Sequence, residues 1–535
     1  MTNTQQRLHR TLVLFLSVII FLSFWLFSRF TVDDAFISWR YGKNLVDFGI
    51  WNYNPAIFDM TQAYTNPIFA VLSIIPNFFK IDVVLFFKLF AIFTLVVFFY
   101  WFTRKAKDKN SLIMTLIFFA LPATFVHAFS GLETFLFTAL MASLLILLFE
   151  ERFYSSILIS LLLFFTRPEA WPLVILIPLY ILTIHLEYNN QGKDLKSISS
   201  TYKEWRLFSW RRFVLAFLLL FIPLAMYFIF HKLHFGNALP NTFYIKSGGS
   251  LSTFSLIFFS YCVLPFIILI PLKKIRLFIF SSLIFGAMIV SYSTSTLLMD
   301  YVGRFSFHIF APVYFFVVYI ASKQTQNFLY VSSTSNPLEG SFKISFQMVI
   351  NIVLLLFLLP FAQAVTKPSE LAAYSDYYPR AIDSHAALGK TLQTITEKYN
   401  LKSFSFGDAG IAAYHSKLIS LDNIGLASSA VAASGVTLAL LDAYHPDITV
   451  FHAKPEGIGL KDHYQETIHQ WSLANGMKMV CDIYWQPAYT LRVFAEQAYP
   501  EIVDICNQSE QRNNQEHRAY FLKTGANPPW SYWKE

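Results

Sequence analysis

The 535-residue chain is 55% hydrophobic and only 14% charged, with a formal net charge of +8 and a mean hydropathy of +0.47. Soluble domains carry about 25% charged residues, so the composition excludes an ordinary soluble protein and indicates an integral membrane protein. The basic residues stand mainly in short segments between apolar stretches, which is the positive-inside pattern and not that of a nucleic-acid-binding protein.

The apolar stretches predict a polytopic α-helical membrane protein with about eleven spans, most of them near the ~20 residues that a bilayer needs. Arg7 and Arg10 precede the first stretch, which lacks a small-residue cleavage site, so we expect a retained signal-anchor and a cytoplasmic N-terminus. Strict alternation then puts every strongly basic loop inside. The expected spans cover roughly residues 11–27, 81–102, 111–126, 134–149, 155–166, 170–185, 213–230, 254–270, 277–291, 306–321 and 344–365.

The first external loop, residues 29–80, contains one apolar segment that is too short to span. Tyr64–Phe79 carries Pro67 and Pro76, and counting it as a span would put the basic segment at 104–109 outside. We therefore expect juxtamembrane helices here, re-entrant or lying at the interface.

We expect residues 1–365 to form the transmembrane part of the chain. Residues 366–535 are polar and mixed, with helical patterns near 382–399, 436–443 and 462–474 and short apolar runs at 403–406, 417–421 and 447–452. This predicts an α/β domain, and an odd number of spans places it outside the cytoplasmic membrane. An oxidising compartment permits a disulfide between Cys481 and Cys506, whereas a metal site at these cysteines lacks ligand spacing.

Polar clusters gather at the outer ends of the predicted spans. A carboxylate at the bilayer centre costs roughly 2.5–3.5 kcal/mol, so acidic pairs belong at the interface or in a polar cavity. Five clusters on one face of so apolar a protein predict a single outward-facing cavity. Its candidate residues are Asp33, Asp34, Arg40, Lys43, Tyr64, Thr65, Asn66, Glu133, Arg167, Glu169, Asn241, Lys246, Asp300 and Arg304.

Several of these residues also have an ordinary structural explanation. In that explanation Glu133 complements a helix dipole, and Arg167 and Glu169 form an ion pair at a helix break. Lys43 and Lys246 would be snorkelling side chains at the interface, and Asp300 and Arg304 a helix-surface pair. The sequence leaves both explanations open.

The chemistry that fits the cavity is group transfer from a lipid-phosphate donor. Asp33 or Asp34 is the candidate general base for an acceptor hydroxyl, while its neighbour orients the acceptor or binds a divalent cation. Arg167, Lys246 and Arg304 are the candidate partners of the departing phosphate. The further candidates for binding the donor phosphate or sugar are Arg40, Lys43, Glu133, Glu169, Asn241 and Asp300, and the candidates on the acceptor side of the loop are Tyr64, Thr65 and Asn66. No other cofactor is expected, and the metal requirement stays open.

Several sequence motifs are spread over most of the chain. The first loop carries the most specific string, Asp33–Ile37 followed by Arg40, Asn44, Gly49 and Tyr64–Pro67. The other segments, in order, are Ser130–Thr134, Arg167–Glu169, Leu239–Tyr244 with Lys246, Arg304–Phe305, Gly407–Gly410 with Tyr414, and Leu421–Leu426. Together these motifs resemble those of GT-C glycosyltransferases, and most closely the branch of the mycobacterial terminal β-arabinofuranosyltransferase and its uncharacterised bacterial relatives.

The resemblance implies an inverting enzyme that uses a polyprenyl-phosphate sugar, with an aspartate of the first external loop as base. It implies transfer of a single sugar to an envelope glycan, lipid or protein at the outer face of the cytoplasmic membrane. Two departures leave the donor open: Gln62-Ala63 stands where the branch has Glu-Gly, and Leu298-Met299 replaces a glycine-rich approach to Asp300.

Two other functions remain as alternatives to single-sugar transfer. A glycan ligase or polymerase would use a diphosphate-linked donor, and a polytopic transporter or lipid flippase would move its substrate without chemistry. Transporters often show repeated halves and midplane charges, neither of which is evident here. In the external domain, Asp408 and Asp422 follow apolar runs and are either ligand residues or turn caps. The sugar, the acceptor, the lipid length and the identity of the base are left open.

Overall fold

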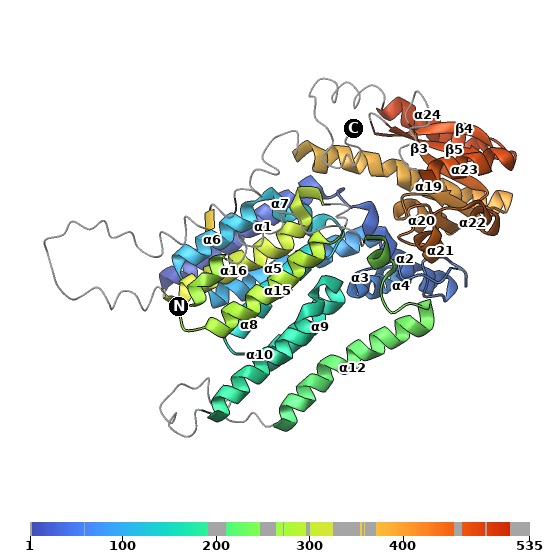
Figure 1. Cartoon of the computed structure of the whole chain (residues 1–535). Helices are drawn as coiled ribbons and strands as arrows, with labels where there is room; N and C mark the ends of the chain where they lie inside the picture. The colour runs from blue at the N-terminus through green and yellow to red at the C-terminus, as the bar shows by residue number, and fades with distance from the viewer. Residues whose placement is uncertain are drawn as a thin grey trace, which may run out of the picture.

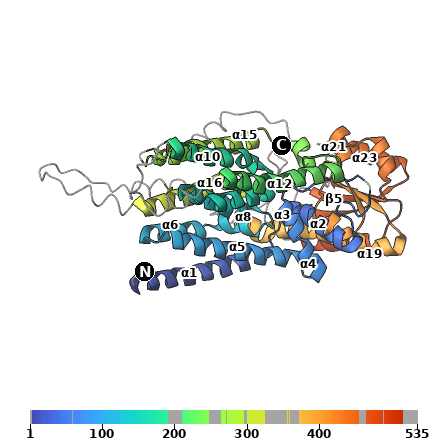
Figure 2. The ribbon, with the colours of Figure 1, turned by 90° about the horizontal axis from the view of Figure 1, so that it is seen from below.

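The computed structural model describes residues 3–57, 59–190, 210–246, 264–270, 272–295, 300–324, 354–355, 358, 371–453, 463–486 and 489–513. A bundle of long apolar helices makes up one end of the molecule, and a small mixed sheet with its own helices makes up the other (Figure 1). Seen from below, many bundle helices run roughly side by side toward the sheet domain (Figure 2).

The bundle is organised around one buried helix. Helix α16 packs against α8 and α6, and 89% of the most apolar window of Tyr301–Lys323 is buried inside the protein. The outer helix α5 instead turns Leu85, Leu89 and Phe93, four residues apart, outward, as expected of a lipid-facing stripe. The bundle comprises α1 (Asn3–Phe27), α5 (Val83–Lys105), α6 (Lys109–Ala120), α7 (Pro122–Phe129), α8 (Thr134–Phe149), α9 (Phe153–Thr166), η1 (Pro168–Ala170), α10 (Trp171–Asn190), α12 (Trp210–Phe235), η2 (Leu264–Leu269), α15 (Ile275–Ser293), η3 (Tyr301–Gly303) and α16 (Arg304–Gln324).

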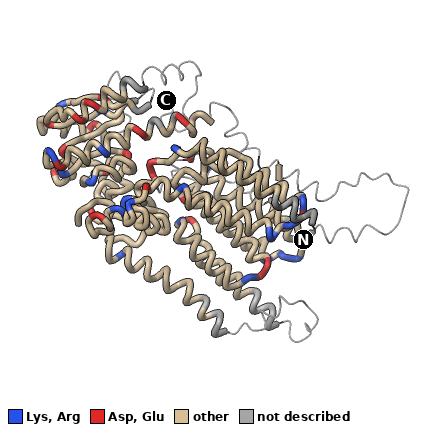
Figure 3. The backbone as a smooth tube through the Cα atoms, turned by 180° about the vertical axis from the view of Figure 1, so that it is seen from behind, with Lys and Arg blue, Asp and Glu red and all other residues tan. Residues whose placement is uncertain are grey.

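The helices identify a multi-pass membrane protein. By length and composition four described helices can cross a bilayer, or five if α6 and α7, bent by 61° at their junction, form one span. Five further apolar helices are shorter, among them Thr11–Phe27 and Thr134–Phe149. Charged residues in the described chain lie mainly at the bundle ends and over the sheet domain (Figure 3). The count of about eleven stays a prediction, and the spans expected at 254–270 and 344–365 lie largely outside the described residues.

A buried lysine links the C-terminal ends of helices α1 and α7. Lys88, on α5, donates from Nζ to the carbonyl oxygens of Phe27 (3.1 Å), Phe30 (2.6 Å) and Phe129 (2.9 Å). These carbonyls belong to the C-terminal ends of α1 and α7 and the turn that follows α1. Helix ends leave such oxygens without intrahelical partners, so one ammonium satisfies three of them.

Residues 29–80, which keep the name first external loop after the side predicted for them, contain three helices in their described part: α2 (Asp33–Phe48), α3 (Pro67–Leu72) and α4 (Ile74–Phe79). The apolar segment expected to be re-entrant or interfacial is helical but divided at Ser73. Helix α2 ends at Gly49, whose left-handed backbone (φ 70°) closes the helix and suits glycine. Gly42 allows α2 to pack on Ser73 and Ile74, since a Cβ there would overlap their atoms.

The C-terminal domain is built on a five-stranded sheet of order β2-β1-β3-β5-β4. Strands β1, β2 and β3 are parallel, whereas β5 pairs antiparallel with both β3 and β4. The short runs 403–406, 417–421 and 447–452 expected from the sequence correspond to β1 (Ser403–Phe406), β2 (Ile419–Asp422) and β3 (Ile448–Ala453), whereas β4 (Lys478–Gln486) and β5 (Tyr489–Ala495) were not foreseen.

Helices surround this sheet and complete the domain. They are η5 (Ala373–Tyr377), α19 (Tyr378–Tyr399), α20 (Ile411–Ser416), α21 (Ser429–Ser434), α22 (Leu438–Tyr444), α23 (His463–Ala474) and α24 (Pro500–Asn513), with α13 (Asn241–Lys246) lying against α21. Cys481 on β4 and Cys506 on α24, which we expected to pair, are disulfide-bonded.

One apolar core joins the first external loop to the C-terminal domain. Ile37, Tyr41 and Tyr53 of the loop belong to the same buried cluster as Leu388, Phe404 and Phe406. Asn54 bonds through both side-chain atoms to the Ser420 backbone, at 3.3 and 2.9 Å, and so covers part of the edge strand β2. The loop and the domain therefore fold against each other, while the predicted boundary at 365 and 366 falls among residues outside the described part.

Candidate active site

The two aspartates that open α2 face different surroundings. Val32 before them is extended (φ −84°, ψ 149°), so Asp33 and Asp34 occupy the first helical positions, near the positive end of the helix dipole. Successive helical side chains point about 100° apart, and this separates the two carboxyl groups. The structure thus distinguishes two residues that the sequence treats as equivalent.

Asp33 is committed to the C-terminal domain. Its Oδ2 accepts the N–H of Gly410 (2.9 Å) and its Oδ1 accepts the N–H of Ile411 (2.7 Å), at the start of α20. Its own N–H donates to the Tyr378 hydroxyl (3.2 Å). Burial, together with the negative charge of Asp408, raises the pKa of Asp33 to about 7. Asp33 therefore attaches the first external loop to the sheet domain through hydrogen bonds.

Asp34 is half-buried and faces cations. Among the described residues we find no hydrogen bond to its carboxylate. Burial raises the pKa of Asp34 above its ordinary value, and the positive charges of Lys246 and Arg304 limit that rise. A carboxylate with unused acceptor atoms and a raised pKa is a better proton acceptor than an ordinary aspartate.

Lys246 and Arg304 provide positive charge next to Asp34. Lys246 closes α13, and burial lowers the pKa of its ammonium while Asp34 raises it. Arg304 opens α16 as a buried residue, 6% exposed, and its Nε and Nη1 have no hydrogen-bond partner in the described structure. Its guanidinium lies 4.8 Å from the ring centre of Phe305. A buried guanidinium without a hydrogen-bonded anion is energetically unfavourable, so this position favours an anionic ligand.

A continuous hydrogen-bonded chain holds Glu133 and Glu169. Asn66 accepts from Ser38 and donates to Glu133 Oε2 (2.5 Å). Arg167 then donates from Nη1 to Glu133 Oε1 (2.5 Å) and from Nε and Nη2 to both oxygens of Glu169 (3.1 and 2.5 Å). The Arg167 side chain is 3% exposed and is already paired with two carboxylates.

Arg167 and Arg304 approach the same aromatic ring. The Arg167 guanidinium lies 5.5 Å from the ring centre of Phe305, which also contacts Arg304. Since Arg167 is neutralised by Glu133 and Glu169, Arg304 and Lys246 are the cations beside Asp34 that remain for a ligand among the described residues. The ion pair expected between Arg167 and Glu169 is thus part of a larger network that orients the site.

Four other predicted residues lie in contacts that are structural in kind. Arg40 donates from Nη2 to the Leu418 carbonyl (2.6 Å), and Lys43 lies 4.5 Å from the ring centre of Tyr414, so both touch the C-terminal domain. Asn241 donates to the Gly425 carbonyl (2.5 Å). Asp300 accepts the N–H of Phe305 (3.1 Å) and so caps α16.

The structure also describes Tyr64, Thr65 and Asn66, the loop residues predicted to lie on the acceptor side. The Tyr64 hydroxyl lies 3.4 Å from His231 Nε2 and receives the Trp51 indole N–H at 3.3 Å. Thr65 is half-buried between Tyr64 and Asn66. Their part in acceptor binding stays a prediction, as does donor binding by Arg40, Lys43, Asn241 and Asp300.

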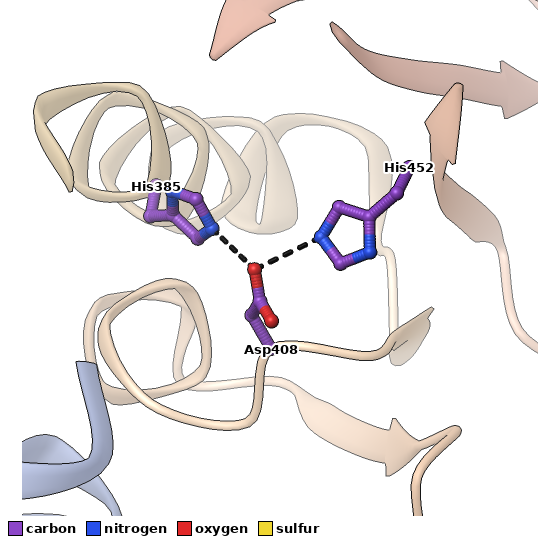
Figure 4. Close-up of side chains that lie close together, drawn as sticks. All are labelled: His385, Asp408 and His452. Atoms are coloured by element: carbon purple, nitrogen blue, oxygen red, sulfur yellow. Dashed lines mark hydrogen bonds and ion pairs between the residues drawn. The ribbon is translucent and has the colours of Figure 1, made fainter. Parts of the chain in front are cut away.

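A second polar cluster lies at the carboxyl ends of the parallel strands; from the sequence we expected Asp408 there as a ligand residue or a turn cap, but missed the two histidines that join it. His385 Nε2 and His452 Nε2 lie 2.6 and 2.9 Å from Asp408 Oδ2 (Figure 4). Burial disfavours a charged Asp408, but His452 and His385 outweigh it and hold the pKa of Asp408 well below its ordinary value. His452 near the end of β3 was the available signal, because carboxyl ends of neighbouring parallel strands meet at one sheet edge; nothing marked His385.

Comparison with known proteins gives little further information. No family model matches the chain, and no curated protein matches it. Among solved structures, the fold is similar to the archaeal oligosaccharyltransferase from Archaeoglobus fulgidus in complex with an inhibitory peptide and a dolichol-phosphate, at 12% identity and a TM-score of 0.46, over 84% of this chain and 70% of that one.

Proposed function

We propose that this protein is a GT-C-type glycosyltransferase that moves one sugar from a polyprenyl-phosphate donor to an envelope glycan, lipid or protein. In this proposal the N-terminus is cytoplasmic, and the active site and the C-terminal domain lie at the outer face of the cytoplasmic membrane. The observation that carries the proposal is the unengaged carboxylate of Asp34 beside Lys246 and the unpartnered guanidinium of Arg304. A base next to an anion site is the arrangement that such a transfer requires.

The reaction assigns a role to each charged group. Asp34 takes the proton of an acceptor hydroxyl as its oxygen attacks the anomeric carbon of the donor sugar. The bond between that carbon and the phosphate oxygen breaks, and its electron pair leaves with the polyprenyl phosphate. Arg304 and Lys246 stabilise the negative charge of the departing phosphate. A single displacement inverts the anomeric centre.

The remaining residues position this pair. Glu133, Arg167 and Glu169 fix the Phe305 ring that Arg304 contacts, and Asn66 fixes Glu133. Asp33 holds the first external loop against the C-terminal domain. Helix α21 of that domain also contacts α13, the helix that ends at Lys246. We call the contact between the first external loop and the C-terminal domain the seam. We assign acceptor binding to this seam, because it lies next to Asp34 and joins both parts of the chain.

The test is a mass profile of envelope glycans in the source cell. We compare the parent, a deletion strain, and the deletion strain carrying wild type, Asp34→Asn, Asp33→Asn or Asp47→Asn. Asp47 is an exposed carboxylate on the same helix and serves as the matched control. The deletion should remove one sugar-sized mass, which wild type and Asp47→Asn restore.

Asp34→Asn should lower the transfer by about 10²–10⁴-fold, the usual contribution of a general base, at normal protein level. Asp33→Asn should lower protein level or stability more than turnover. Full rescue by Asp34→Asn would contradict the proposal. Loss of an oligosaccharide-sized mass would instead favour a diphosphate-linked donor, and an unchanged profile with altered lipid distribution would favour transport.

A further inference from the structure

We propose that His385, Asp408 and His452 form a binding site for a late first-row divalent cation, most readily Zn²⁺, at the seam between the sheet domain and the first external loop. This proposal concerns a site separate from Asp34, Lys246 and Arg304 and does not depend on the glycosyltransferase function.

The donor atoms converge from three separate elements. His385 comes from α19, Asp408 from the loop after β1, and His452 from β3, and their ligand atoms lie within 4.8 Å of one another. Figure 4 shows both imidazole rings pointing their Nε2 atoms at the same carboxylate oxygen. Residues that are 23 and 44 positions from Asp408 in the chain are brought to one point by the fold.

The chemistry of the set selects the class of ion. Two imidazole nitrogens and one carboxylate oxygen are the protein ligands of many zinc sites, which keep a fourth position for water. Mg²⁺ and Ca²⁺ prefer oxygen ligands and are disfavoured here. A tetrahedral ion with bonds of about 2.0–2.1 Å holds its ligand atoms about 3.3 Å apart. The nitrogen–oxygen distances of 2.6 and 2.9 Å therefore need to widen by only about half an ångström or slightly more.

The surroundings hold the ligands in place. The side chains of His385 and His452 are 1% and 6% exposed, whereas Asp408 is 24% exposed and leaves a way in. Both imidazoles pack against the ring of Phe406, with distances between ring centres of 5.5 and 5.4 Å. These contacts restrict the orientation of both rings.

The site is linked to the first external loop by a short stretch of backbone. Asp408 stands two residues before Gly410, and Gly410 and Ile411 donate the N–H groups that hold Asp33. An ion bound to Asp408 would link the loop after β1 to α19 and β3. It would thereby fix the position of the N–H groups of Gly410 and Ile411, which hold Asp33. We therefore assign the ion a positioning role at the seam.

The experiment uses the full-length protein in detergent, without a histidine tag, stripped with a chelator and passed through gel filtration. One equivalent of ZnCl₂ is added, and bound zinc is measured by mass spectrometry after a second filtration. Wild type should retain about one ion per chain, and neither MgCl₂ nor CaCl₂ should displace it. Asp408→Asn and His452→Ala should weaken zinc binding by at least about 100-fold, beyond the effect of losing an outer-shell partner.

His469→Ala is the matched control, because His469 lies in the same domain against Phe451 and Phe494 and outside the cluster. It should bind zinc as wild type does. Zinc binding that is absent from wild type, or equal in wild type and His452→Ala, would overturn the proposal and leave a hydrogen-bonded cluster.

A second measurement covers the case in which the variants fold poorly. Stripped wild type loaded with one equivalent of Co²⁺ should show visible ligand-field bands of tetrahedral intensity and magnetic coupling to two imidazole nitrogens. A spectrum of hydrated Co²⁺ would overturn the proposal even without a folded variant. The chelator should also lower the melting temperature of wild type, because an ion bound only to the folded state stabilises it, and should leave that of His452→Ala unchanged.

Discussion

Gly410→Ala tests the seam between the first external loop and the C-terminal domain. A Cβ at this position would overlap the carboxyl group and the backbone oxygen of Asp33, so the loop has to move away. The movement breaks the bonds from Gly410 and Ile411 to Asp33, now 2.9 and 2.7 Å long. Hydrogen bonds to charged groups are worth about 1.5–3 kcal/mol each, so we expect a loss of at least about 3 kcal/mol.

The assay is thermal unfolding of the purified protein in detergent, combined with limited proteolysis that detects release of the C-terminal domain. A loss of about 3 kcal/mol should lower the transition of a domain of this size by roughly 6–12 °C. Gly476→Ala is the control, because nothing lies within 4 Å of a Cβ there and only its left-handed backbone disfavours alanine, at about 1–2 kcal/mol.

A double-mutant cycle identifies the cause of the loss. Asp33→Ala should cost much less in the Gly410→Ala background than in wild type, because the bonds it removes are already broken. Additive costs for the two substitutions, or a Gly410→Ala protein as stable as the Gly476→Ala control, would refute the argument that these bonds hold the seam.

Three further predictions follow from buried groups. Transfer by wild type should decline as pH falls through the raised pKa of Asp34, because the base must be ionised; a midpoint near the ordinary value of 3.8 would contradict its burial. Lys88→Met should lower the free energy of unfolding by about 2–5 kcal/mol, seen as a lower melting temperature, since three carbonyl oxygens lose their donor. Cys481→Ser with Cys506→Ser should cost about 3 kcal/mol in denaturant unfolding for the loop of 25 residues, and an equal effect of reductant on both proteins would contradict this.

The class of fold could be predicted because its signals are local. Apolar stretches and the positions of arginine and lysine indicate membrane helices without knowledge of packing. The proline pair in Tyr64–Phe79 likewise indicated helices that do not span, and the structure divides this segment into α3 and α4. Strands β4 and β5 were missed because a charged, aromatic-rich segment such as Lys478–Gln486 lacks a clean alternation of apolar residues.

The site could be predicted only as a set of candidates. The sequence placed Asp33 and Asp34 together but carried no information on their partners, since Gly410 and Ile411 are 377 and 378 residues from Asp33. It also could not show that Arg167 is neutralised by Glu133, or that Arg304 is not paired within the described residues. Such contacts depend on how distant segments pack, which periodicity does not encode.

The measurement that tests the central claim most directly is transfer by the purified protein. Wild type and Asp34→Asn are supplied with a panel of polyprenyl-phosphate sugars and an envelope extract as acceptor, and released polyprenyl phosphate is measured by mass spectrometry. Our account predicts release by wild type from one donor of the panel, with inversion at the anomeric carbon, and a loss of about 10²–10⁴-fold in Asp34→Asn. Equal release by the two proteins would contradict the assignment of Asp34 as the base.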